Sequence, residues 1–139
     1  GVSCHQIYLT EISMSFSNYL ETEILDFAFT TGTATRPTSW YVALYTAAPG
    51  EGGGGTEVST GSYVRQSVTF SVSTNTASNT AAVEYPTATA SYGTVTYVGI
   101  FDASSGGNLL AYSALNVSKL IDTGDVFRIP TGDLDITLD

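Results

Sequence analysis

The spacing of apolar residues changes once along the chain. Between residues 15 and 29 apolar residues recur every three or four positions, which is the spacing of one face of an α-helix. Four apolar side chains share this spacing: Phe16, Leu20, Ile24 and Phe27. Asn18, followed three residues later by Glu21, is typical of a capping box at the start of a helix. We therefore predict one helix in residues 15–29 and expect its apolar face to turn toward the core.

After residue 30 apolar and polar residues alternate in short segments, which is typical of half-buried strands. The predicted strands span 39–46, 63–73, 82–85, 94–102, 109–117, 126–129 and 134–138. The turn at 104–108 predicts a hairpin, and the glycine-rich run at 49–57 predicts a mobile exposed loop. Short strands separated by frequent turns predict a mainly β fold, either an antiparallel β-sandwich or a jelly-roll-like domain, with one short N-terminal helix.

The predicted strand at 39–46 is apolar on both faces. Val42 and Leu44 point to one side of this strand, whereas Tyr41 and Tyr45 point to the other. Such a strand lies either in the centre of a sheet or between the core and a partner subunit. We take Tyr41 and Tyr45 as candidate partner-binding residues, because fully desolvated tyrosines often anchor interfaces.

The first residues differ in character from the rest of the chain. We divide the chain into an extended N-terminal arm, residues 1–14, and a single β domain, residues 15–139. Ile7, Leu9 and Ile12 are apolar without helical spacing, so the hypothesis is that the arm docks on a neighbouring subunit. The alternative is a disordered tail or an upstream extension of the reading frame.

The charge balance narrows the class of partner. The chain has 4 Lys and Arg residues against 13 Asp and Glu residues, a formal net charge of −9. Because the four cations are scattered singly, we expect no binding to nucleic acid or to an anionic membrane. Neither an apolar stretch of membrane-spanning length nor a secretory signal is visible, so we expect the chain to be made in the cytoplasm of the producing cell.

Candidate catalytic and metal-binding residues are few. One cysteine and one histidine cannot form an internal disulfide or a usual zinc site, and the neighbouring Cys4 and His5 diverge in an extended chain. Paired carboxylates such as Asp133 and Asp135 could serve a glycosidase, and the turn at 122–125 could contribute to a calcium site. Carboxylates in turns and on solvated strand faces are ordinarily solubilising. We expect no enzyme activity, no catalytic or metal-binding residues and no cofactor.

Aromatic residues are the remaining chemical feature, with nine Tyr, six Phe and one Trp. Tyrosines pack cores, anchor protein interfaces and stack on sugar rings. The sequence leaves these three uses open, so protein and sugar both remain candidate partners.

Three stretches of the chain form a set: 40–66, which runs from Trp-Tyr-Val-Ala-Leu-Tyr through the glycine-rich loop to Tyr-Val-Arg-Gln, then 93–103 and 132–138. Together they resemble a widespread family of small tailed-bacteriophage virion proteins. The resemblance covers residues 15–139, and members of the family are described as tail-fibre, structural, capsid cement or decoration proteins. The family pattern carries no catalytic residues, so the resemblance implies a non-enzymatic virion structural protein.

Two locations in the virion follow from this resemblance. The first is a capsid cement or decoration protein, which would bind the major capsid protein on the outer capsid surface as a homotrimer and stabilise the lattice. The second is a tail-fibre or tail-tip component that contacts host glycans through exposed Tyr and Trp side chains. We expect the capsid location, with binding to the major capsid protein and to copies of the chain itself.

Overall fold

The computed structural model describes residues 5–138. These residues form twelve strands and one helix, which confirms the prediction of a mainly β fold with one short helix. In chain order the elements are β1 (His5–Tyr8), β2 (Ile12–Phe16), α1 (Asn18–Phe29), β3 (Tyr41–Ala47), β4 (Thr56–Glu57), β5 (Gln66–Ser67), β6 (Phe70–Ser73), β7 (Thr76–Asn79), β8 (Val83–Glu84), β9 (Gly93–Phe101), β10 (Leu109–Ile121), β11 (Asp125–Ile129) and β12 (Leu134–Thr137).

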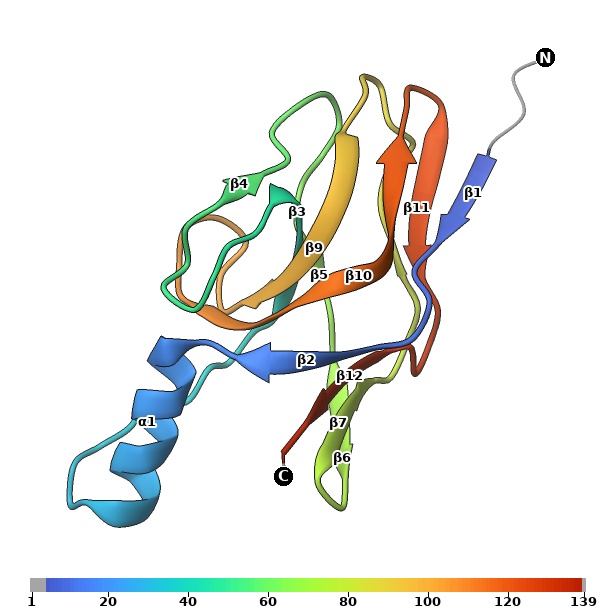
Figure 1. The fold of residues 1–139 in the computed structure, drawn as a ribbon. Helices are drawn as coiled ribbons and strands as arrows, with labels where there is room; N and C mark the ends of the chain where they lie inside the picture. The colour runs from blue at the N-terminus through green and yellow to red at the C-terminus, as the bar shows by residue number, and fades with distance from the viewer. Residues whose placement is uncertain (1–4, 139) are drawn as a thin grey trace.

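The larger sheet has the strand order β4-β3-β9-β10-β2-β12-β7-β6, and β5 also pairs with β3 (Figure 1). Its centre is the antiparallel set β3, β9 and β10, and β9 and β10 form the hairpin predicted from the turn at 104–108. Strand β3 therefore has neighbours on both edges. Its two faces are apolar because Val42 and Leu44 pack in the main core, whereas Ala43 and Tyr45 pack in a second apolar cluster.

Both N-terminal strands pair with strands from the end of the chain, and both pairings are parallel. Strand β1 pairs with β11 in a small sheet of order β1-β11-β8, and β2 lies between β10 and β12 in the large sheet (Figure 1). The sheets are therefore mixed, whereas the sequence predicts antiparallel ones. Parallel partners are distant in sequence, so a local hydrophobic pattern carries no information about them.

The hypothesis of an arm on a neighbouring subunit is wrong for residues 5–14. Ile7, Leu9 and Ile12 are buried in the core of their own chain, and Leu9 is 2% exposed. The backbone amide of Leu9 donates to the carbonyl oxygen of Arg128 at 3.1 Å, which continues the pairing of β1 with β11. Pairing satisfies the backbone while every second side chain enters the core, so the segment needs no second subunit. Cys4 and the rest of residues 1–4 lie outside the described part of the chain.

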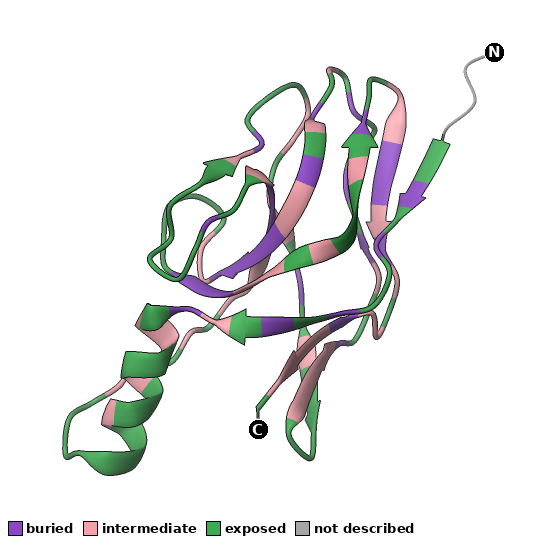
Figure 2. Ribbon diagram, viewed as in Figure 1, coloured by how far each residue is buried: buried purple, intermediate pink, exposed green. Residues whose placement is uncertain are grey.

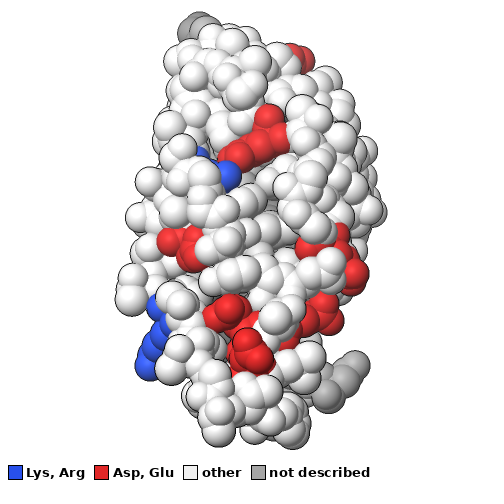
Figure 3. Space-filling view, turned by 90° about the vertical axis from the view of Figure 1, so that its left-hand side faces the viewer, with Lys and Arg blue, Asp and Glu red and all other residues white. Residues whose placement is uncertain are grey.

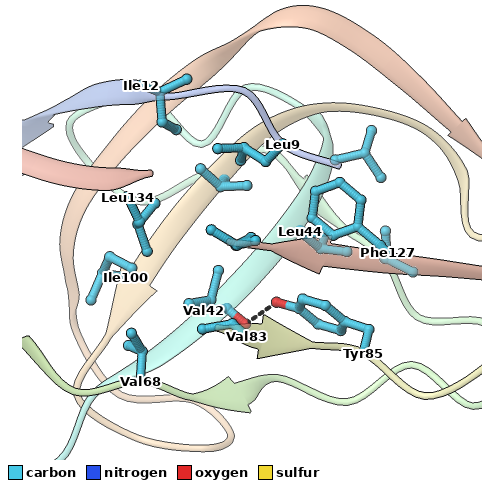
Figure 4. Close-up of a cluster of buried hydrophobic side chains, with 14 of the residues drawn as sticks. Leu9, Ile12, Val42, Leu44, Val68, Val83, Tyr85, Ile100, Phe127 and Leu134 are labelled. Atoms are coloured by element: carbon cyan, nitrogen blue, oxygen red, sulfur yellow. Dashed lines mark hydrogen bonds between the residues drawn. The ribbon is translucent and has the colours of Figure 1, made fainter. Parts of the chain in front are cut away.

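The main core lies between the two sheets (Figure 4). Leu9 and Ile12 from the N-terminal segment meet Val42 and Leu44 of β3 there, and all four are buried. Tyr85 is buried beside them, and its hydroxyl donates to the carbonyl oxygen of Val42. Burial raises the pKa of the Tyr85 phenol, so this group stays a neutral donor.

The N-cap of helix α1 is one residue earlier than the Asn18 that the sequence predicts. Ser17 is the N-cap: its hydroxyl oxygen accepts from the amide of Leu20 at 3.2 Å and donates to the carbonyl oxygen of Leu109. Ser17 is itself buried, so the cap also fixes the start of the helix to β10. The helix then extends away from the sheets (Figure 1).

The prediction that α1 faces the core is wrong. No residue of the helix is buried, and Figure 2 shows the helix as exposed over most of its surface. Among the elements of the described chain, the helix packs mainly on β10 and β2, and Tyr19 and Leu20 of its first turn are partly buried against the core. Because its axis leads away from the sheets, its apolar spacing has no core to face beyond that turn.

Candidate interaction surface

The second half of α1 exposes large apolar side chains. Leu25 is 58% exposed, Phe27 is 77% exposed and Phe29 is 81% exposed. At about 100° per residue, Leu25 and Phe29 lie on one side of the helix and Phe27 on nearly the opposite side. A helix that is apolar on all sides is normally buried, and exposed apolar patches commonly mark interaction sites. This end of α1 is therefore a candidate interaction surface, which we call the helix end.

The polar positions of the same helix are acidic. Glu21, Glu23 and Asp26 give α1 three negative charges and it has no basic residue. The carboxylate of Glu23 accepts from the amide of Thr35 at 2.7 Å, which fixes the returning segment 30–40 beside the helix. Figure 3 shows acidic side chains spread over this side of the molecule and few basic ones. The helix end is thus an apolar surface surrounded by negative charge.

A groove of about 500 Å³ lies beside the base of the helix. Its lining includes Phe16 and Leu20 on either side of the helix cap and Phe70 and Val72 of β6. Its lining is mainly apolar, and its only charged residue is Arg36. The groove is therefore suited to an apolar segment that carries negative charge.

Tyr41 and Tyr45, the candidate partner-binding residues, do not form a free surface. Tyr45 is 4% exposed and belongs to a second apolar cluster with Ala43, Phe101 and Leu109 on the far side of the large sheet. The rings of Tyr45 and Phe101 stack with their centroids 6.4 Å apart. Tyr41 is half-buried. The expectation that Tyr45 anchors a subunit interface is thus wrong, because its own chain covers it.

Arg65 provides much of that cover. Its guanidinium carbon lies 3.7 Å from the centroid of the Phe101 ring, and its Nε and Nη2 each donate to Glu57 at 2.9 Å. Its Nη1 also donates to the carbonyl oxygens of Ala103 and Gly106, at 3.0 and 2.8 Å. Five donors in one plane let an arginine hold several segments at once. We call this arrangement the Arg65 clasp.

The clasp also affects the tyrosines beneath it. Burial, with a smaller contribution from the Glu57 charge, raises the pKa of Tyr45 to about 12. Burial also raises the pKa of Tyr63, and so does the hydrogen bond of its hydroxyl to the Glu57 carboxylate at 2.6 Å. Both phenols are therefore neutral in the folded protein at ordinary pH.

The titratable groups show no constellation for metal binding or nucleophilic catalysis in residues 5–138. That part of the chain has no group of three or more His, Cys, Asp or Glu residues placed to hold a metal ion. His5 Nδ1 lies 3.7 Å from Asp125, on an exposed strand edge. Glu11 has a raised pKa because its side chain hydrogen-bonds to Asp135 and faces that charge. Residues 5–138 contain no helix that is long and apolar enough to cross a membrane.

Comparison with protein families decides the class of protein. The model of the family described as "Podophage GP4 fiber I protein gp80" matches residues 15–137. The chain belongs to this family. A search of curated proteins found no match. Membership in the gp80 fiber family confirms the resemblance to tailed-phage structural proteins and shows a virion structural role.

Sequence reasoning misses two of the features described above, the groove and the Arg65 clasp. The groove joins residues from α1, β6 and β12, which are far apart in the chain and have no common motif. In the sequence, Arg65 is simply one polar residue in the predicted strand at 63–73, so its contacts with other segments cannot be recognised. Leu25 and Phe29 are the exception, because they break the helical spacing and make the helix apolar on a second side, and this signal is visible in the sequence.

Proposed function

We propose that this member of the gp80 fiber family is a structural component of a phage tail fibre. The observation that carries the proposal is the family match over residues 15–137, because the family's description names a fiber. The match favours the tail-fibre prediction over the capsid cement prediction, which it does not support. Contact with host glycans stays a prediction.

The proposed mode of action is stoichiometric binding to other virion proteins and to copies of the same chain. Each interface formed in the assembled particle favours the assembled state over free subunits by mass action. The apolar helix end and the groove are the surfaces that support this role. A family of structural proteins also supports a non-enzymatic function.

Location in the particle tests the proposal. Purified virions of a phage that produces the chain would be labelled with gold-conjugated antibody and viewed by electron microscopy, with antibodies to a major capsid protein and to a tail protein as controls. We expect label on the tail fibres. Label over the head would overturn the proposal and restore the capsid prediction.

Copy number provides an independent measurement. Quantitative mass spectrometry of intact virions would compare the chain with the major capsid protein. We expect a handful to a few dozen copies per particle, as a tail part requires. Hundreds of copies would indicate a capsid lattice and contradict the tail location.

A further inference from the structure

We propose that the helix end of one chain docks into the groove of a second copy, so that each copy donates one helix end and accepts another. The inference rests on the proposed function for its setting in the virion. It adds to that function the surfaces, the residues and the type of self-association. The two halves of the contact are argued separately below, followed by the reason for choosing a second copy.

The helix end needs a cover that its own chain does not supply. Phe27 and Leu25 lie on opposite sides of α1, so packing one of them on the body of the same molecule leaves the other in water. An aromatic side chain buries about 150–250 Å² when it is fully covered, so two exposed phenylalanines represent a large unused contact area. A groove that encloses the helix end, rather than a flat surface on one side of it, meets this requirement.

The groove likewise exposes apolar side chains that its own chain does not cover. Val72 is 75% exposed and Leu138 is 51% exposed, and both line the groove. The floor reaches the buried side chains of Ile100 and Leu110, so an apolar insert there would continue the main core. A volume of about 500 Å³ lies within the range of pockets that hold organic ligands of drug size, which is sufficient for aromatic side chains.

The charges of the helix end and of the groove favour a second copy of the same chain as the partner. The helix end brings Glu23 and Asp26, and the charged residue of the groove is Arg36. Arg36 forms no ion pair within residues 5–138, whereas each ion pair seen there uses His5, Arg65 or Arg128. In a chain of net charge −9, a cation at the contact offsets the repulsion that would otherwise separate two copies.

The positions of the two surfaces allow the contact to repeat. Leu20, in the first turn of α1, lines the groove, whereas Phe27 and Phe29 lie at the other end of the same helix, so one chain carries both surfaces at separate places. The helix extends away from the body, and neither Phe27 nor Phe29 lines the groove of its own chain (Figure 1). A contact between two different patches is heterologous, and it closes into a ring when the rotation between copies allows. In a closed ring, such as the predicted homotrimer, every helix end and every groove is occupied.

The first experiment measures association of the purified chain by sedimentation velocity over a series of concentrations. We expect an oligomer that the double variant Phe27→Ser/Phe29→Ser converts to a monomer, with a dissociation midpoint raised at least tenfold. Circular dichroism should show that the variant remains folded, because both residues are exposed. The matched control is Val117→Ser/Leu120→Ser, which removes two exposed apolar side chains of β10 and should leave association unchanged.

The second experiment identifies the two surfaces in contact. In a Cys4→Ser background, a chain with Phe29→Cys is mixed with a chain with Val72→Cys and oxidised. We expect disulfide-linked heterodimers containing one chain of each kind. Homodimers of the Phe29→Cys chain alone would show that helix ends meet each other, and this result would overturn the proposal.

The remaining outcomes separate this inference from the proposed function. A wild-type chain that is monomeric at every concentration would overturn the inference, because another protein must then cover the helix end, while tail labelling would still stand. Heterodimers together with gold label on the capsid would overturn the tail location only. Arg36→Glu should weaken association at least threefold, and an unchanged midpoint would contradict the argument from charge.

Discussion

Tyr45 and the end of α1 exchange the roles that the sequence predicts for them. The sequence places α1 against the core and Tyr45 against a partner subunit. In the structure Tyr45 is 4% exposed under its own chain, whereas Phe29 at the end of α1 is 81% exposed. Both segments are rich in apolar residues, so apolar content alone does not decide between core and interface.

The difference between the two regions lies in what covers them. Tyr45 lies under the Arg65 clasp, whose members come from β4, from the segment before β5 and from the β9–β10 turn. The helix end has no comparable cover within residues 5–138: segment 30–40 returns beside α1 through the Glu23–Thr35 hydrogen bond, but Leu25, Phe27 and Phe29 stay exposed. An apolar face is covered internally when later parts of the chain return to it.

Removal of the Tyr45 side chain should have the largest effect. Tyr45→Ala leaves a cavity between Ala43, Phe101 and Leu109, and loss of a buried aromatic side chain typically costs about 3–5 kcal/mol. Urea unfolding would measure the decrease in the free energy of unfolding. Tyr8→Ala, at a tyrosine that is half exposed, is the control. A loss below about 1 kcal/mol for Tyr45→Ala would show that the second cluster is not a core.

Opening the clasp should have an intermediate effect. Arg65→Gln removes the bonds to Glu57 and the contact with Phe101, and hydrogen bonds to charged groups contribute about 1.5–3 kcal/mol. We expect a loss of about 2 kcal/mol in urea unfolding. The matched control is Arg128→Gln, because the exposed pair of Arg128 and Glu84 at 3.5 Å should contribute less than about 1 kcal/mol. Equal losses for the two variants would contradict a specific role of the clasp.

Alkaline pH provides a smaller and reversible perturbation of the same region. The pKa of Tyr45 is raised to about 12 in the folded state, against 10.0 as its ordinary value. The unfolded chain therefore loses this proton first, so the stability from the neutral phenol is complete below pH 10 and is lost as the pH rises toward 12. Thermal unfolding across this range should show a falling midpoint. Tyr45→Phe should make the decrease shallower, and an identical slope would exclude Tyr45 as its source.

The smallest effect is expected at the helix end. Phe27→Ser should change the free energy of unfolding by no more than about 0.5 kcal/mol, because the side chain is 77% exposed. Urea unfolding must be measured at a concentration at which the chain is monomeric, so that association does not contribute. A loss above about 1 kcal/mol would place Phe27 in the core of its own chain and remove the contrast with Tyr45.

Local sequence patterns predict the elements whose spacing is regular and whose partners are near. A short apolar run predicts β3, alternation predicts β12, and the turn at 104–108 predicts the β9–β10 hairpin. The parallel partners of β1 and β2 depend on contacts between the two ends of the chain, so the pattern around Ile7 and Leu9 is compatible with an arm as well as a strand. The Arg65 clasp is likewise a product of tertiary structure, because its partners have no fixed spacing from Arg65.

The parallel pairings of β1 with β11 and of β2 with β12 also bear on the order of folding. Of the described strands, a ribosome releases β1 and β2 first and their partners β11 and β12 last. Closing so long a loop is entropically costly, and domains dominated by distant pairings fold slowly. During synthesis Ile7, Leu9 and Ile12 therefore remain uncovered until the C-terminal strands arrive. Truncated chains that lack β11 and β12 would keep this apolar segment exposed, which is a liability for aggregation.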